Sequence, residues 1–256
     1  MPRVRREQYQ QQGFVFPIEV LQPDEVTLAL ASLREVETRC HMSLPRIPTL
    51  HRFFPWAFQI AANPALLDAV EDLIGRNIIV WGTLVLAKPP DGRTFIPWHQ
   101  DNPYAAFLAD SPSVTAWIAL TPATRESGCM RIIPGPPRVV LPFTTEKHPD
   151  DMLIRGIGVT TAIDESVAVD IELQPGQASL HEISVLHGSH PNCSNAPRIG
   201  FIVRYATPGM RPPKYPLYCV RGDPGDVPVS EPPTESSFKA FEEYLRLDSQ
   251  TPGGAV

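Results

Sequence analysis

Apolar residues recur at helical spacing in the first third of the chain. They form a stripe from residue 23 to 36, which begins with a proline and two acidic residues suited to a helix N-terminus. A second apolar face runs from 64 to 74, between Asn63 as N-cap and Gly75 as C-cap. The sequence therefore predicts two amphipathic helices.

From residue 77 the pattern changes to short β-branched and apolar runs separated by proline and glycine turns. Helices followed by many short strands predict a mainly β protein, a sandwich or barrel with helices packed on one outer face. The predicted strands are 78–87, 114–120, 130–133, 168–173, 178–186 and 199–205.

Two segments, 144–167 and 206–233, are too long and irregular for simple turns, and we expect them to be functional loops. A last amphipathic helix is predicted at 236–247, docked on the barrel. We expect one domain over residues 1–256. Its parts are a helical region at about 20–75, a β core at about 76–207, and a C-terminal loop and helix at 208–256.

Composition and charge exclude several classes of function. A net charge of −6 without a basic cluster excludes a nucleic-acid partner, and the 30 prolines suit a loop-rich β protein. The four cysteines lack disulfide or metal spacing, and no apolar run approaches the roughly 20 residues of a membrane helix. We therefore expect a cytoplasmic protein that does not bind a membrane. A monomer or homodimer with a small molecule as its partner is expected as well, the small molecule on the strength of the family resemblance given below.

His99 and Asp101 are the first candidate metal ligands. In an extended segment, residues i and i+2 point to the same face about 6.6 Å apart, so both side chains can reach one ion. An imidazole with one carboxylate suits Fe(II), Mn(II) or Zn(II) better than calcium. Because such pairs are common by chance, a solvated loop is the alternative until a third ligand is found.

The third ligand is expected within the apolar segment that contains His181 and His187. Six residues separate them by roughly 20 Å at strand rise, so only one is expected in the site. His187 is favoured because the chain after it is predicted to form a hairpin that returns Arg198 beside it, with Ser189 on the same face. A guanidinium and a hydroxyl near a metal indicate an anchor for a carboxylate ligand.

Taken together, these motifs resemble the phytanoyl-CoA dioxygenase family of non-haem iron oxygenases. The ordered pieces are His99-Gln100-Asp101, the segments 116–120 and 128–135, and 187–194 with Arg198 eleven residues past His187. Residues 13–16 are similar too, and the resemblance covers roughly residues 7 to 207. One departure is Pro136-Pro137-Arg138 after Pro134-Gly135, where family members commonly continue with Ser-His.

The resemblance implies a double-stranded β-helix (jelly-roll) that binds Fe(II) through His99, Asp101 and His187. It also implies that 2-oxoglutarate chelates the iron, its distal carboxylate held by Arg198 with Ser189, and that Trp117 lines the cosubstrate pocket. Three protein ligands leave open positions for the oxo-acid and O₂.

Asp101 favours hydroxylation, since relatives that halogenate have a small residue in its place. Desaturation, cyclisation and rearrangement stay open. No acyl-CoA substrate is carried over, because Lys147 and His148 lie beside Asp150 and Asp151 and make a poor phosphate site. A function in specialised metabolism is expected. The alternatives are a non-oxidative metal hydrolase or isomerase on a cupin-like barrel, and a metal-free binding module.

The other polar residues near these motifs are expected either to have structural roles or to lie in or near the substrate pocket. His181 is expected to pack within the barrel, His190 to be exposed, Gln100 to brace the loop and Cys193 to lie in a turn. Three residues are predicted in or near the substrate pocket: Asn102, Tyr104 and Lys88. For Lys88, a solvated strand end is the alternative.

Overall fold

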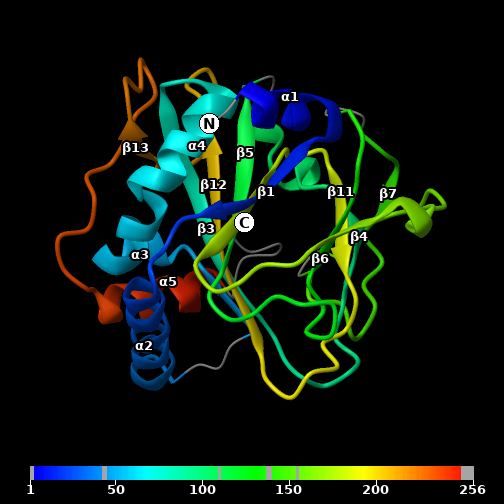
Figure 1. Ribbon diagram of the computed structural model, residues 1–256. Coiled ribbons are helices and arrows are strands. Elements are labelled where there is room, and N and C mark those ends of the chain that lie inside the picture. The colour runs from blue at the N-terminus through cyan, green and yellow to red at the C-terminus, as the bar shows by residue number, and fades with distance from the viewer. Residues whose placement is uncertain (1–2, 42–44, 109–110, 137–139, 154–155, 249–256) are drawn as a thin grey trace.

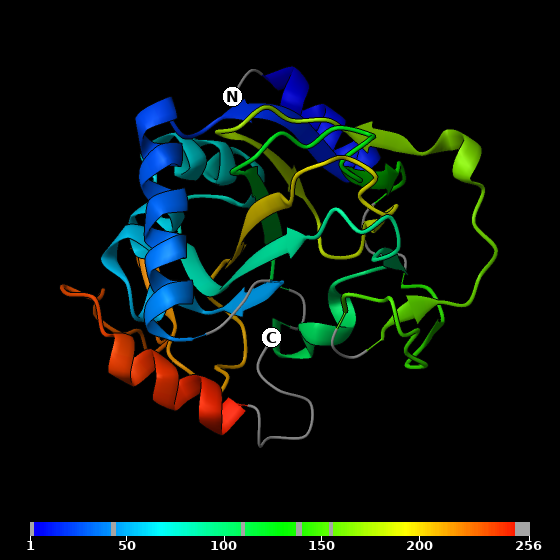
Figure 2. The ribbon, with the colours of Figure 1, turned by 90° about the horizontal axis from the view of Figure 1, so that it is seen from below.

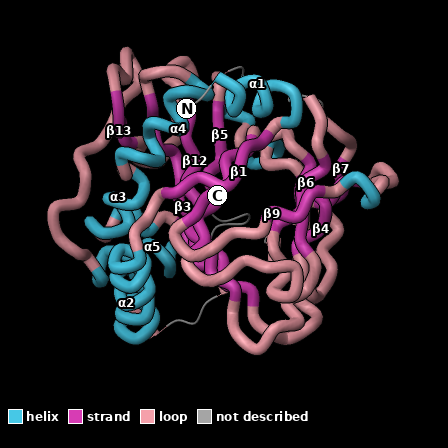
Figure 3. The backbone as a smooth tube through the Cα atoms, viewed as in Figure 1, coloured by secondary structure: helices cyan, strands magenta, loops and turns pink. Residues whose placement is uncertain are grey.

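Two antiparallel β-sheets of unequal size form the core of the computed structural model, which describes residues 3–41, 45–108, 111–136, 140–153 and 156–248. Most of the helices lie on one side of the larger sheet, and the smaller sheet lies on the other (Figure 1). Sheets and helices thus form layers, and long loops extend from the small-sheet side (Figure 3).

The large sheet has seven strands. Its central strands are buried along their whole length because helices cover one face and the small sheet the other, which explains their nearly continuous apolar sequence. In order across the sheet they are β1 (Phe14–Glu19), β10 (Gln177–His181), β5 (Ser113–Ala119), β12 (Arg198–Ala206), β3 (Ile78–Lys88) and β13 (Tyr218–Arg221), with β2 (Arg46–Pro48) also paired to β3.

The small sheet has four strands, in the order β4 (Ile96–His99), β11 (Leu186–Ser189), β6 (Met130–Ile133) and β9 (Val169–Ile171). A separate two-stranded sheet joins β7 (Phe143–Thr144) to β8 (Gly158–Val159). One apolar cluster between the two main sheets contains Leu84, Trp117, Ile132 and Ile202. Two facing antiparallel sheets that enclose a pocket agree with the double-stranded β-helix that the resemblance implies.

Both N-terminal helices predicted from the apolar stripes are confirmed, as α2 (Pro23–Arg39) and α4 (Pro64–Ile74). Asn63 is the N-cap, and its side-chain oxygen accepts from the backbone nitrogens of Ala65 and Leu66 at 3.0 and 3.2 Å. Gly75 follows as C-cap with a φ of 96°. α2 lies along one side of the sheet strands (Figure 2).

The other helices were not all expected. α1 (Arg3–Gln12) and α3 (Pro55–Ala61) were not predicted because they lack a long apolar stripe. The described loops also contain four short 3-10 helices. These are η1 (Leu50–Arg52), η2 (Asn102–Tyr104), η3 (Ala106–Leu108) and η4 (Glu165–Val167). In the described ranges, every helix is too short or too polar to cross a lipid bilayer.

The C-terminal helix, α5 (Phe238–Asp248), docks on the body of the protein as predicted. Phe241 is fully buried, and its ring packs 5.3 and 5.4 Å from the rings of Phe53 and Phe54. The preceding loop, 206–233, contains strand β13, which pairs with β3. This loop is therefore partly a sheet edge.

Two sequence predictions about the segment 178–205 are wrong. The expected strand 178–186 is two strands, β10 and β11, because Ser184 donates from its backbone nitrogen to the Glu182 carboxylate at 2.7 Å in a turn between them. The expected hairpin of β11 with β12 does not form either. β11 pairs with β4 and β6 in the small sheet, whereas β12 pairs with β3 and β5 in the large one.

Candidate active site

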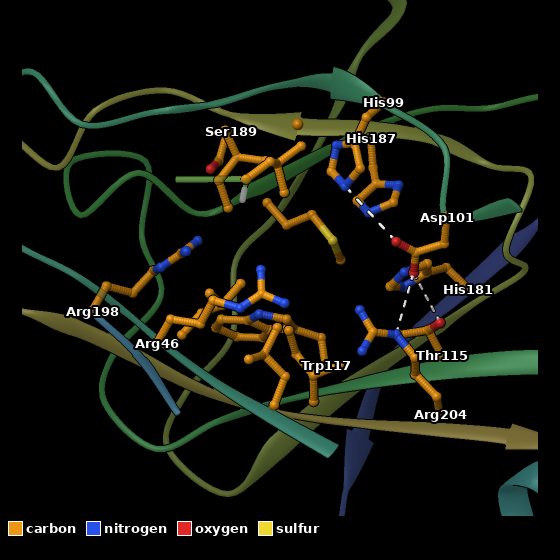
Figure 4. Close-up of a pocket in the computed structure, with 17 residues that line it drawn as sticks. Arg46, His99, Asp101, Thr115, Trp117, His181, His187, Ser189, Arg198 and Arg204 are labelled. Carbon is orange, nitrogen blue, oxygen red and sulfur yellow. Dashed lines mark hydrogen bonds and ion pairs between the residues drawn. The ribbon is translucent and has the colours of Figure 1, made fainter. Parts of the chain in front are cut away.

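Three potential metal ligands meet where β4 and β11 pair. His99 ends β4, Asp101 follows two residues later, and His187 lies opposite His99 in the antiparallel register. One ligand atom from each residue lies within 4.8 Å of the others, and all three side chains are buried. Asp101 is beyond the end of the strand, with φ −80° and ψ −14°, yet its carboxylate oxygen approaches His99 Nε2 at 3.9 Å (Figure 4).

Backbone carbonyls fix the orientation of both imidazoles. His99 Nδ1 lies 2.9 Å from the carbonyl oxygen of Pro97, and His187 Nδ1 lies 2.9 Å from that of Val185. A carbonyl oxygen only accepts, so each Nδ1 carries the hydrogen and each Nε2 presents a lone pair to the pocket. Burial, together with His187, lowers the pKa of His99 to about 3, which keeps the ring neutral and able to ligate.

The carboxylate of Asp101 stays ionised despite its burial. Burial alone would raise its pKa, but the positive charge of Arg204 holds the pKa below its usual range. Thr115 also donates a hydrogen bond to the second carboxylate oxygen at 3.2 Å. Two imidazoles and one carboxylate on one side of a pocket form a donor set that fits a first-row transition metal with open coordination positions.

Arg198 lies at the other end of the same pocket (Figure 4). It is 1% exposed, donates to the carbonyl oxygen of Gly128 at 2.7 Å, and stacks 5.1 Å above the ring of Trp117. Its Nε has no hydrogen-bond partner within the described ranges, so this buried cation lacks an anion. Trp117 can lie against β12 because residue 200 is glycine; a β-carbon there would be 2.2 Å from the indole.

Lys88 is buried beside Arg198. The two residues are register partners of β3 and β12, and Lys88 Nζ donates to Ser189 Oγ and to the carbonyl oxygen of His190. Burial, followed by repulsion from Arg198, lowers the pKa of Lys88 to about 6. Two basic groups and a hydroxyl therefore gather at this end of the pocket, opposite the candidate metal ligands.

The model of one protein family, described as phytanoyl-CoA dioxygenase (PhyH), matches residues 9–200. The chain belongs to the phytanoyl-CoA dioxygenase family. Among curated members, a probable phytanoyl-CoA dioxygenase of Caenorhabditis elegans is 28% identical over 159 residues, 59% of this chain and 51% of that protein. The peroxisomal phytanoyl-CoA dioxygenase of Homo sapiens is 27% identical over 139 residues, 53% of this chain and 41% of that protein. The chain spans about half the length of these curated relatives.

Two solved structures are similar to most of this chain. ThoJ, described as a non-heme monooxygenase, is 29% identical with a TM-score of 0.79, over 94% of each chain. EvdO2 from Micromonospora carbonacea var. aurantiaca, solved with 2-oxoglutarate, is 25% identical with a TM-score of 0.63, over 81% of this chain and 91% of that one. These likenesses confirm the family and fold that the motifs resemble.

In this family member, the pocket contains several polar residues that the sequence analysis did not assign to it. His181 was expected to lie about 20 Å from His187, but the turn after β10 brings the two rings to 4.8 Å, and both histidines line the pocket. Arg46, Thr115 and Arg204 line it too. Of these three, only Arg204 could have been placed in the pocket from the sequence, because an even spacing of six from Arg198 puts both side chains on one face of a strand.

The three residues predicted for the substrate pocket have different positions. Lys88 is neither solvated nor part of the lining, since it is buried behind Ser189. Asn102, in η2, is half-buried and is also absent from the described lining. The backbone of Tyr104 ends η2, but its side chain lies outside the described residues, as do Pro137 and Arg138.

The structural roles given to three other residues are confirmed. Gln100 braces the loop, because it accepts from the backbone of Leu141 at 2.8 Å and donates to the carbonyl of Ser184. His190 is exposed and contacts Arg131. Cys193 is an exposed residue of the loop between β11 and β12.

Proposed function

We propose that this protein is an Fe(II)- and 2-oxoglutarate-dependent dioxygenase that hydroxylates a small molecule. The observation that carries the proposal is the joint lining of one pocket by His99, Asp101 and His187 at one end and by buried Arg198 at the other. A metal site alone would suit many reactions. A metal site facing an arginine that lacks an anion suits a cosubstrate with a chelating end and a distal carboxylate.

Each group in the pocket has a role in this proposal. His99 Nε2, His187 Nε2 and a carboxylate oxygen of Asp101 hold the iron, which with 2-oxoglutarate and O₂ supplies an oxidant strong enough to cleave a C–H bond. Arg198 binds the distal carboxylate of 2-oxoglutarate through its charged donors, and Ser189 adds a hydroxyl beside it. Trp117 limits the width of the cosubstrate site by stacking on Arg198.

The rest of the lining favours oxidation of the bound substrate over side reactions. Apolar side chains, among them Leu84, Met130 and Ile202, separate the polar groups and exclude water. Asp101 occupies the position where halogenating relatives have a small residue, which supports hydroxylation over halogenation. A substrate in specialised metabolism is part of the proposal.

The decisive experiment is anaerobic addition of Fe(II) and 2-oxoglutarate to the purified protein. We expect a visible charge-transfer absorption band, and on admission of O₂ the release of succinate and CO₂. Asp101→Ala should remove both signals, whereas Asp24→Ala, an exposed change in α2, should remove neither.

A non-oxidative metal hydrolase or isomerase gives the opposite pattern. It would bind Zn(II), form no band with 2-oxoglutarate and tolerate loss of Arg198. A protein that binds neither metal nor 2-oxoglutarate in calorimetry would be a binding module that keeps only the fold. Either pattern contradicts the proposal.

A further inference from the structure

A second arginine, Arg204, lines the pocket beside the candidate metal ligands. It lies six residues beyond Arg198 on β12, about 20 Å along the strand. Its side chain is 8% exposed, and Figure 4 shows the guanidinium below Asp101, at the opposite end of the pocket from Arg198. The proposed cosubstrate site, between the metal and Arg198, leaves Arg204 outside it.

The donors of Arg204 are poorly satisfied. Its Nε is 4.0 Å from a carboxylate oxygen of Asp101, longer than a hydrogen bond, and neither Nε nor Nη1 has a hydrogen-bond partner within the described residues. The guanidinium packs 5.3 Å above the ring of Trp81, which removes it further from water. Buried, unpaired donors on a cation are costly, so this arrangement favours binding of an anion.

The charge of the pocket leads to the same conclusion. Asp101 is the only carboxylate among the described lining residues. Two arginines line the pocket with it, Arg204 at the same end and Arg198 at the far end. An Fe(II) dication and a 2-oxoglutarate dianion cancel each other, and Asp101 offsets one arginine. One positive charge therefore remains, even with half-buried Arg46 left out of the balance.

We infer that Arg204 binds a carboxylate group of the substrate, and hence that the substrate is a carboxylic acid held by this group next to the metal. The inference rests on the proposed function. A single guanidinium fork matches one carboxylate in charge and geometry, whereas a phosphate dianion would overcompensate it. His181, whose two ring nitrogens have no partner within the described ranges, lines the same end and can donate one hydrogen bond to the carboxylate.

The test compares carboxylates with their uncharged amides. The protein, with Fe(II) and saturating 2-oxoglutarate under anaerobic conditions, is titrated with matched pairs of increasing size, from acetate and acetamide to phenylacetate and phenylacetamide and naphthylacetate and naphthylacetamide. Calorimetry gives the affinities, and the charge-transfer band reports whether 2-oxoglutarate stays bound. We expect at least one carboxylate to bind about tenfold or more tightly than its amide, because hydrogen bonds to charged groups are worth that much.

Variants assign the preference to Arg204. In Arg204→Gln the carboxylate and amide should bind within about twofold of each other, and Arg204→Lys, which keeps the charge but loses the fork, should give an intermediate ratio. Arg125→Gln, at an exposed ion pair with Asp170, should keep the wild-type ratio. If Arg204→Gln does not fold, the wild-type ratio and Arg204→Lys still decide.

Two results overturn the inference: equal affinity for acids and amides in the wild-type protein, or an undiminished acid preference in Arg204→Gln or, if that variant does not fold, in Arg204→Lys. Failure of the proposed function is recognised separately, since no charge-transfer band then forms. In that case the same titrations with Zn(II) in place of Fe(II) still measure whether Arg204 binds carboxylates.

Discussion

The two sheets contribute different chemistry to one pocket. The small sheet, with its short strands, carries His99 and His187, whose rings are oriented by backbone carbonyls at Nδ1 and line the pocket. The large sheet carries Arg198 and Arg204 on one long strand, β12, that is paired on both sides. The candidate metal ligands and the two arginines thus come from opposite walls of the pocket, so that the proposed metal site and the proposed anion sites are kept apart.

From this division we expect that substitution of a candidate ligand in the small sheet abolishes metal binding. Substitution of an arginine in the large sheet should leave metal binding intact. The largest effect is expected for His187→Ala, which removes a metal ligand. Fe(II) affinity should fall by more than about 100-fold, since loss of even an outer partner of a ligand typically costs 10–100-fold. Calorimetry with Fe(II) under anaerobic conditions measures it. His190→Ala, an exposed histidine three residues away, is the control and should bind Fe(II) normally.

Arg198→Gln tests the opposite wall. The affinity for 2-oxoglutarate should fall by about 100-fold or more, because breaking a buried charge pair costs about 3–5 kcal/mol. The affinity for Fe(II) without 2-oxoglutarate should change little. The two affinities are measured separately, and a variant that loses Fe(II) as strongly as His187→Ala would contradict the division between the sheets.

Gly200→Ala should have a smaller effect, through packing. The new β-carbon would lie 2.2 Å from the Trp117 ring, so the indole must move away from β12 and from Arg198. Overpacking of this kind costs about 1–3 kcal/mol, seen as a lower melting temperature, and the KM for 2-oxoglutarate should rise several-fold. Gly82→Ala, where nothing lies within 4 Å of the added carbon, is the matched control in the same sheet.

Lys88→Met affects the junction of the two sheets and should change the pH dependence of stability. The folded-state pKa of Lys88 is lowered to about 6, below the roughly 10.4 of an unfolded lysine. Between these values the unfolded chain binds the extra proton, so wild-type stability gains up to about 1.4 kcal/mol per pH unit as pH rises.

Denaturant unfolding of the metal-free protein between about pH 7 and pH 9.5 measures this slope, which the methionine variant should reduce. Lys214→Met, at an exposed lysine, should leave it unchanged. Equal slopes in wild type and Lys88→Met would mean that Lys88 stays protonated in the fold.

Helix positions and the identities of the metal ligands could be predicted because each depends on local chemistry. The stripe of α2 and the cap at Asn63 follow from helix periodicity and side-chain hydrogen bonding within a few residues. His99, Asp101 and His187 could be selected by ligand type and order, and the fold places them together.

The position of His181 could not be predicted in this way. Its distance from His187 was estimated from strand rise, and a turn in which the backbone nitrogen and the hydroxyl of Ser184 both donate to the Glu182 carboxylate ends the strand and invalidates the estimate. The same is true of the connection from β11 to β12, which crosses from one sheet to the other, although its sequence resembles a hairpin.

The sequence by itself determined the family, the helices α2, α4 and α5, and the residues of the candidate metal site, since these depend on residue type and short-range spacing. Only the tertiary structure decided that Lys88 is buried against Arg198, that His181 joins the pocket, and that Arg204 faces Asp101. Those contacts depend on strand register and on which sheet each strand enters. Both are set by the packing of side chains far apart in the chain, where a shift of one residue would turn every side chain to the other face.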